Sequence, residues 1–145
     1  MRLSKYELKN AGIFQRGTYL AQITETTEYV DECVPDKIYW LFHLQIIVDN
    51  GFLKPHVHCV ECSDDENSEF AHIMADLHQI MGKTPDKMIC AQEVNDLYVE
   101  MVLDYNLVPS NSFKNEAILR NTIVSMESSR LCKLKFMLCE TDEDD

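Results

Sequence analysis

Alternation of apolar and polar residues along the chain predicts several β-strands. The clearest run covers residues 38–48, where every second side chain is large and apolar while the intervening ones are mixed. Residues 97–105 repeat this pattern, and a stretch rich in β-forming residues follows Gly17. One face of each strand is therefore expected to meet a core. The strands predicted in this way are 17–24, 38–48, 54–62 and 97–105, with one or two more around 117–126 and 131–138.

The spacing of apolar residues changes between the third and fourth of these strands, and there it predicts a helix. Asn67 or Ser68 can cap its start, and Gly82 is a typical stop. Residues 3–16 form a lead-in with at most a helical turn. Turn signals lie at 31–37 and at Asp49-Asn50-Gly51. The apolar stripe of the helix consists of Phe70, Ile73, Met74, Leu77, Ile80 and Met81.

This order of elements predicts a mainly β (β+α) fold. It matches an OB-fold-like, five- to six-stranded Greek-key barrel with one helix between strands 3 and 4. An α+β roll fits the same order. With 145 residues, 46% of them hydrophobic, the chain can build a core without disulfide or metal staples. Residues 1–138 are expected to form one domain, and residues 139–145 an acidic C-terminal tail.

The overall charge narrows the functional classes. A net charge of −12 opposes a broad electrostatic grip on nucleic acid, although a local basic groove is compatible with it. No apolar run approaches the roughly 18 residues of a membrane span, and the first residues lack a signal-peptide pattern. We therefore expect a cytoplasmic protein without membrane contact. Its six cysteines are then expected to be reduced thiols.

The sequence carries little that indicates catalysis or metal binding. It has no glycine-rich phosphate loop, nucleophile elbow or His-Glu-x-x-His motif, so we interpret the chain as a non-enzyme without a cofactor. His56, His58, Cys59 and Cys62 are zinc-type ligands and remain weak candidates. In an extended strand, however, Cys59 would face away from the other three. A strand with polar histidines and buried thiols is the favoured interpretation.

Several short motifs in order give the chain a resemblance to a known family. The segment 17–23 resembles a "G-x-Y-x-A-x-I" opening strand, and residues 39–51 resemble a long aromatic-aliphatic strand with a "D-G/N-G" turn. Residues 77–82 resemble a helix ending in hydrophobic-Gly, and 97–101 a hydrophobic-x-V-x-hydrophobic strand. The family comprises phage-encoded, OB-fold, single-stranded-DNA-binding-like proteins associated with replication and recombination. The resemblance implies this fold and single-stranded DNA as the partner.

A single-strand interface combines aromatic rings that stack on bases with cations that hold phosphates. The sequence offers off-core and loop aromatics with basic residues near them. The alternative is that these rings belong to the core or its rim and that the cations only solubilise. The candidate residues are Tyr29, Lys37, Tyr39, Phe52, Lys54, Tyr98, Phe113, Lys114 and Arg120.

The acidic end of the chain has two interpretations. A flexible polyanion can compete with DNA for a basic groove and can dock replication or recombination proteins. It can also be a solvated end that aids solubility. The acids concerned are Glu140, Asp142, Glu143, Asp144 and Asp145.

The charge also supports a rival function. This is an acidic, DNA-mimicking inhibitor or adaptor of the anti-defence type, which would bind a protein partner. In either case an open sheet edge could pair with a second copy of the chain, so a homo-oligomer is possible.

Overall fold

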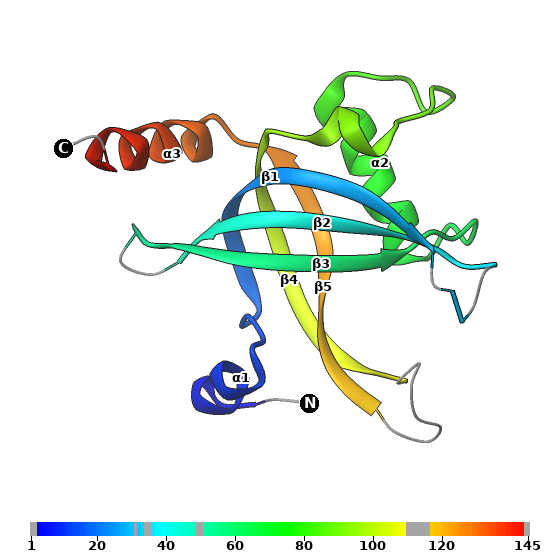
Figure 1. Cartoon of the computed structure of the whole chain (residues 1–145), viewed down its shortest axis with the longest axis horizontal. Helices are drawn as coiled ribbons and strands as arrows, with labels where there is room; N and C mark the ends of the chain where they lie inside the picture. The colour runs from blue at the N-terminus through cyan, green and yellow to red at the C-terminus, as the bar shows by residue number, and fades with distance from the viewer. Residues whose placement is uncertain (1–2, 31, 34–35, 49–50, 110–116, 144–145) are drawn as a thin grey trace.

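A computed structural model gives the fold of the chain and describes residues 3–30, 32–33, 36–48, 51–109 and 117–143 (Figure 1). Five strands and three helices follow one another, with a short 3-10 turn, η2 (Ala91–Val94), before the fourth strand. In chain order the elements are α1 (Lys5–Ala11), β1 (Gly17–Val30), β2 (Ile38–Ile47), β3 (Leu53–Glu61), α2 (Glu69–Met81), β4 (Leu97–Pro109), β5 (Ala117–Ser128) and α3 (Arg130–Glu143).

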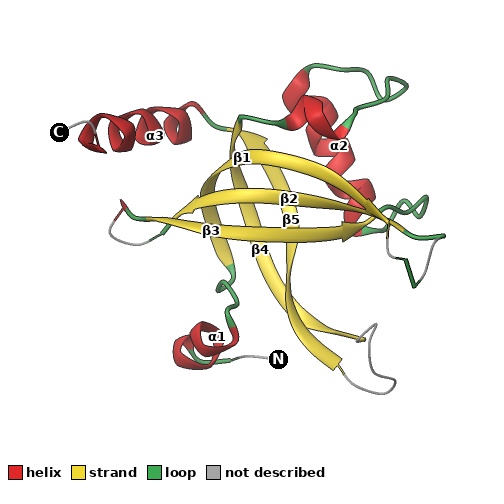
Figure 2. Cartoon of the chain, in the orientation of Figure 1, coloured by secondary structure: helices red, strands yellow, loops and turns green. Residues whose placement is uncertain are grey.

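The strands form one antiparallel sheet in the order β3-β2-β1-β4-β5. β1 lies at its centre and is shared between two ladders. Its residues 17–23 pair with β4, and its residues 20–30 pair with β2. The sheet curls, so that β1–β3 cross over β4 and β5 in Figure 2. The predicted mainly β architecture is confirmed as a five-stranded, antiparallel half-barrel.

The core lies on the concave side of this sheet. Trp40, Phe42, Leu44 and Ile46 are all buried along β2, as their alternation predicts. In β4 the buried side chains are again every second residue. Together with Ala21 and Ile23 of β1, they form one cluster against α2. The β4 members of the cluster are Val99, Met101 and Leu103, and the remaining members are Phe14, Val60, Ile73, Leu77, Ile89, Ala91, Val94, Ile123 and Met126.

α2 fulfils the helix prediction. Its N-cap is Ser68, whose side-chain oxygen accepts a hydrogen bond from the Ala71 amide at 3.1 Å. Gly82 ends it with φ of 67°, a left-handed conformation in which a Cβ would be strained. Ile73 and Leu77 are its buried residues. None of the helices among the described residues is long and apolar enough to cross a membrane.

The expectation of a single helix, with a strand at 131–138, was wrong. α1 is a complete helix, capped by the Ser4 side chain, and α3 occupies residues 130–143. Cys132 and Phe136, four residues apart, are buried on one side of α3, and the Cys132 amide donates to Ser129 Oγ at 3.0 Å. A cap followed by an apolar pair at this spacing is a helix signal. The alternation of residues 131–138 masked it.

Glu69, the first residue of α2, connects the two edge strands. One of its carboxylate oxygens lies 2.8 Å from His58 Nε2 on β3 and accepts the Ile123 amide of β5 at 2.7 Å. Seven residues later, Asp76 accepts the Met126 amide at 2.9 Å. Because β5 is an edge strand, these carboxylates take the place of a neighbouring strand as acceptors for its amides.

Candidate functional site

The first and second strands part at a fork, and a cavity lies in it. Leu20 and Ile47 are the last pair of the β1–β2 ladder at this end. Below that pair, residues 17–19 bond only to β4, while β2 continues into the turn toward β3. The cavity has a volume of about 680 Å³. Its walls are Lys9, Ile13, Phe14, Gln15, Gly17, Thr18, Tyr19, Leu20, Ile47, Val48, Lys54 and Lys135.

Three lysines from distant parts of the sequence line this fork. Lys9 comes from α1, Lys54 from β3 and Lys135 from α3. Among the described residues no acid lines the cavity, and none of the three ammonium groups forms an ion pair there. The chain as a whole has 25 acidic and only 13 basic residues, so this local excess of positive charge contrasts with the overall composition. The fork can therefore attract an anion despite the overall charge.

The Lys54 ammonium is held above an aromatic ring. Its Nζ lies 4.9 Å from the centre of the Phe14 ring, within the range of a cation–π interaction. Phe14 is itself buried, and the edges of its ring meet Tyr19 and His56, with centroids 5.3 and 5.2 Å away. The charge therefore sits on a packed aromatic base rather than at the end of a freely moving chain.

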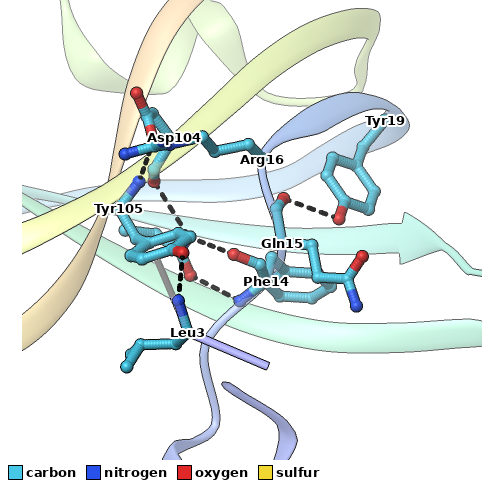
Figure 3. Close-up of polar contacts among 8 residues, drawn as sticks. Leu3, Phe14, Gln15, Arg16, Tyr19, Asp104 and Tyr105 are labelled. Atoms are coloured by element: carbon cyan, nitrogen blue, oxygen red, sulfur yellow. Dashed lines mark hydrogen bonds and ion pairs between the residues drawn. The ribbon is translucent and has the colours of Figure 1, made fainter. Parts of the chain in front are cut away.

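Polar contacts hold the floor of the fork in place (Figure 3). The Tyr19 hydroxyl donates to the Gln15 carbonyl at 2.8 Å. The buried Asn121 of β5 accepts the Phe14 amide and donates to the Phe14 carbonyl, both at 2.9 Å. Next to it, Arg16 forms an ion pair with Asp104. The lead-in segment is thus fixed to β1, β4 and β5 before it reaches the sheet.

The structure divides the predicted interface residues between two ends of the β1–β2 pair. Lys54 lines the fork, and Phe52, at the turn before β3, is 70% exposed. At the opposite end, the Tyr29 and Tyr39 rings lie 6.2 Å apart, and Tyr29 is half exposed. Lys37 lies beyond them and pairs with Glu61 at 3.2 Å. These residues therefore do not form one continuous surface.

Other predicted interface residues have structural roles. Arg120 donates to the Cys59 carbonyl and to Glu69 Oε1, the latter at 3.2 Å, so it joins β5 to β3. The Tyr98 ring packs against Phe136 of α3 with centroids 5.4 Å apart. Phe113 and Lys114 lie outside the described residues, as do Asp144 and Asp145. The backbone of Glu140, Asp142 and Glu143 continues α3, so the predicted boundary at residue 138 falls within a helix.

Sequence reasoning missed Lys9 and Lys135. Their approach to Lys54 depends on how α1 and α3 dock, and no local motif reports that. The one available signal was negative: neither lysine has an acid three or four residues before it in the sequence that would pair with it if the segment were helical.

The weak metal candidates are not brought together. His58 contacts Glu69, and the His56 ring lies between Phe14 and His58. Cys59 is exposed on the other face of β3, as the alternation predicts. Burial raises the pKa of the Cys62 thiol to about 11, which disfavours the thiolate that binds zinc. Within the part of the chain that is described, no group of three or more His, Cys, Asp or Glu is arranged to hold a metal.

Two partly buried groups, His56 near the fork and Glu69 at the sheet edge, have shifted pKa values. Burial, with the nearby His58 and Lys54, lowers the pKa of His56 to about 4, and its Nε2 has no hydrogen-bond partner. Burial alone would raise the pKa of Glu69. The hydrogen bond and charge of His58, the Ile123 amide and the Arg120 charge together hold it below the usual value. His56 is therefore neutral and Glu69 ionised at neutral pH.

Comparison with known proteins does not place the chain in a family: no protein-family model matches it, and no curated protein matches it.

Proposed function

We propose that the protein binds single-stranded DNA, as a phage or mobile-element type protein that assists replication or recombination. The observation that carries this proposal is the fork, where three lysines have no ion pair and no acid lines the walls among the residues that the structure describes. Phosphates of an extended strand are the anions that such a set of point charges suits. The strand order and the helix between β3 and β4 support an OB-type fold.

In this proposal the strand enters at the fork and its bases meet the exposed ring beside it. Phe52 is exposed and precedes Lys54 by two residues in the sequence, so we propose that a base stacks on its ring while the phosphate meets the lysine. Tyr29 and Tyr39 offer a second stacking site at the far end of the same strands. Binding there needs the Lys37–Glu61 ion pair to open before that lysine can contact phosphate.

The acids at the end of the chain would regulate this binding. They follow Lys135 on the same helix, and in this proposal they compete with DNA for the lysines of the fork. Glu140, Asp142 and Glu143 are thus proposed to weaken DNA binding and, when displaced, to become available to replication or recombination proteins.

A second candidate is the acidic, DNA-mimicking inhibitor or adaptor that binds a protein partner. The observation in its favour is that two of the predicted DNA-binding cations, Lys37 and Arg120, are already paired with carboxylates. The net charge of −12 favours this candidate as well. The two candidates differ in whether the fork binds a nucleic acid at all.

Fluorescence anisotropy of labelled oligo-dT separates them. The titration uses the wild-type chain, a K9Q/K54Q double variant and a K87Q control, at low and moderate salt. Lys87 lies in the loop between α2 and η2 and is not among the residues that line the cavity. We expect binding by wild type and K87Q, and a loss of about tenfold or more in the double variant. Wild-type protein that fails to bind at low salt would reject the DNA proposal in favour of the protein partner.

The same titration tests the tail. A chain that ends at Leu138 lacks the five terminal acids, and we expect it to bind oligo-dT more tightly than the full chain. Unchanged affinity would mean that the acids do not reach the fork.

A further inference from the structure

The last helix buries one side against the sheet and turns another apolar side outward. Cys132 and Phe136 are buried against the sheet. Leu131, Leu134 and Leu138, spaced by three and four residues, are 56%, 58% and 67% exposed. This spacing places the three leucines in one stripe along the helix, turned away from the buried pair. α3 also projects beyond the sheet (Figure 1).

The charges along α3 run against the helix dipole. Its first half contains Arg130, Lys133 and Lys135, and acids occur only from residue 140 onward. The helix has no acid in its first turn and no basic residue in its last turn. A helix carries partial positive charge at its N-terminus and partial negative charge at its C-terminus, so cations at the start and anions at the end are unfavourable. A second helix that packs in the opposite direction would offset the unfavourable charges at both ends of α3.

We propose that the partner is the α3 of a second copy of this chain, packed antiparallel. Antiparallel packing opposes the two dipoles and brings the acidic end of each helix toward the N-terminal end of the other, where Arg130 lies. With Leu134 near its own counterpart, Leu131 of each chain faces Leu138 of the other. One stripe therefore serves both sides of a two-fold interface, and each leucine is covered by a leucine.

The small area of this surface limits the affinity of the dimer. Three leucines and their flanking charges on a helix of 14 residues form an interface below the roughly 1,200 Å² of stable complexes. The dimer is therefore weak and concentration-dependent, with a dissociation constant on the order of micromolar. The acidic half of the helix also opposes the alternative in which the leucines lie on an anionic lipid surface.

Sedimentation velocity of the full chain, from about 1 to about 200 µM, tests the proposal. We expect the mass to rise from 16.8 kDa toward twice that value. L134E should stay at the monomer mass over the whole range. The control is L107E, because Leu107 is 53% exposed on β4 and far from α3 in sequence. It should dimerise as wild type does. Circular dichroism confirms that each variant is folded.

Charge reversal tests the antiparallel orientation. R130E should weaken the dimer by about tenfold, and combining it with D142K should restore it, because each chain then carries the exchanged charges at both ends of the stripe. A monomer mass for wild type at every concentration would overturn the proposal and assign the stripe to a different protein. Dimers that survive L134E, or an R130E/D142K variant no better than R130E, would overturn it as well. None of these measurements involves DNA, so the result is independent of the proposed function.

Discussion

Glu69 and His58 lie 2.8 Å apart, carboxylate to Nε2, at the place where the two free edges of the curled sheet approach each other. His58 belongs to β3, and the same carboxylate accepts the Ile123 amide of β5. Arg120 adds a contact from β5 to Glu69 and to the β3 backbone. The half-barrel is therefore joined by side chains where a closed barrel would have a ladder of backbone hydrogen bonds.

Replacing Glu69 should destabilise the protein strongly. E69A leaves the buried His58, the Ile123 amide and Arg120 without their acceptor, and breaking such a partly buried network typically costs about 3–5 kcal/mol. The free energy of unfolding, measured with urea, checks this. E66A is the control, since Glu66 is exposed in the preceding loop, and it should change stability by less than about 0.5 kcal/mol. An E69A loss as small as that of E66A would show that the edges do not depend on this residue.

Stability should fall as the pH decreases from about 6.5 toward 4. The folded pKa of His56 is about 4 and its usual value is 6.5, so the unfolded chain binds the extra proton first. The lowered pKa of Glu69 acts in the same direction at the acidic end of this range. Thermal unfolding at pH 7.5 and pH 5 should therefore give a lower Tm at pH 5.

The His56 part of this pH effect is separable. H56Q keeps a polar side chain but cannot titrate, so its Tm should fall less between the two pH values than the wild-type Tm. The exposed His72 of α2, replaced in H72Q, provides the control and should leave the wild-type difference intact. Equal differences for wild type and H56Q would contradict the assignment.

Replacing Asn121 should affect both the stability of the protein and the geometry of the fork. Its amide joins both backbone groups of Phe14 and also donates to the Asp104 carbonyl at 3.0 Å. N121A leaves these groups unpaired, and we expect a loss of about 2–3 kcal/mol. It should also weaken oligo-dT binding under conditions where the variant is still folded. N106A, at an exposed site on β4, should do neither.

The salt dependence of DNA binding should report on individual lysines. Each phosphate contact with a single strand contributes about 0.7 to the slope of log K against log salt. K54Q should therefore lower the slope by about that amount. K37Q should change it less, because Lys37 is occupied by Glu61. If K54Q and K37Q change the slope equally, the phosphates do not bind preferentially at the fork.

Much of the secondary structure could be predicted from the local sequence pattern. The alternation in β2 and the Ser68–Gly82 helix could be predicted because burial repeats every second residue in one and every third or fourth in the other. Residues 131–138 satisfied both periods at once, and only tertiary packing of Cys132 and Phe136 decides for the helix.

The candidate site was far less accessible to such reasoning. Lys54 and Phe52 stood among the predicted residues, but the pattern gave equal weight to Arg120 and Tyr98, which the structure uses for packing and edge contacts. Whether a cation is paired depends on side chains distant in sequence. Arg120, for example, meets Glu69, 51 residues away.

The fork also has a consequence for how the protein is made. Lys9 and Lys54 leave the ribosome early, whereas Asn121, which fixes Phe14, and Lys135 come near the end of translation. A nascent chain that has released only its first four strands has neither the floor nor the third charge. The fork can therefore attract an anion only late in synthesis, and fragments that stop before α3 are expected not to bind nucleic acid.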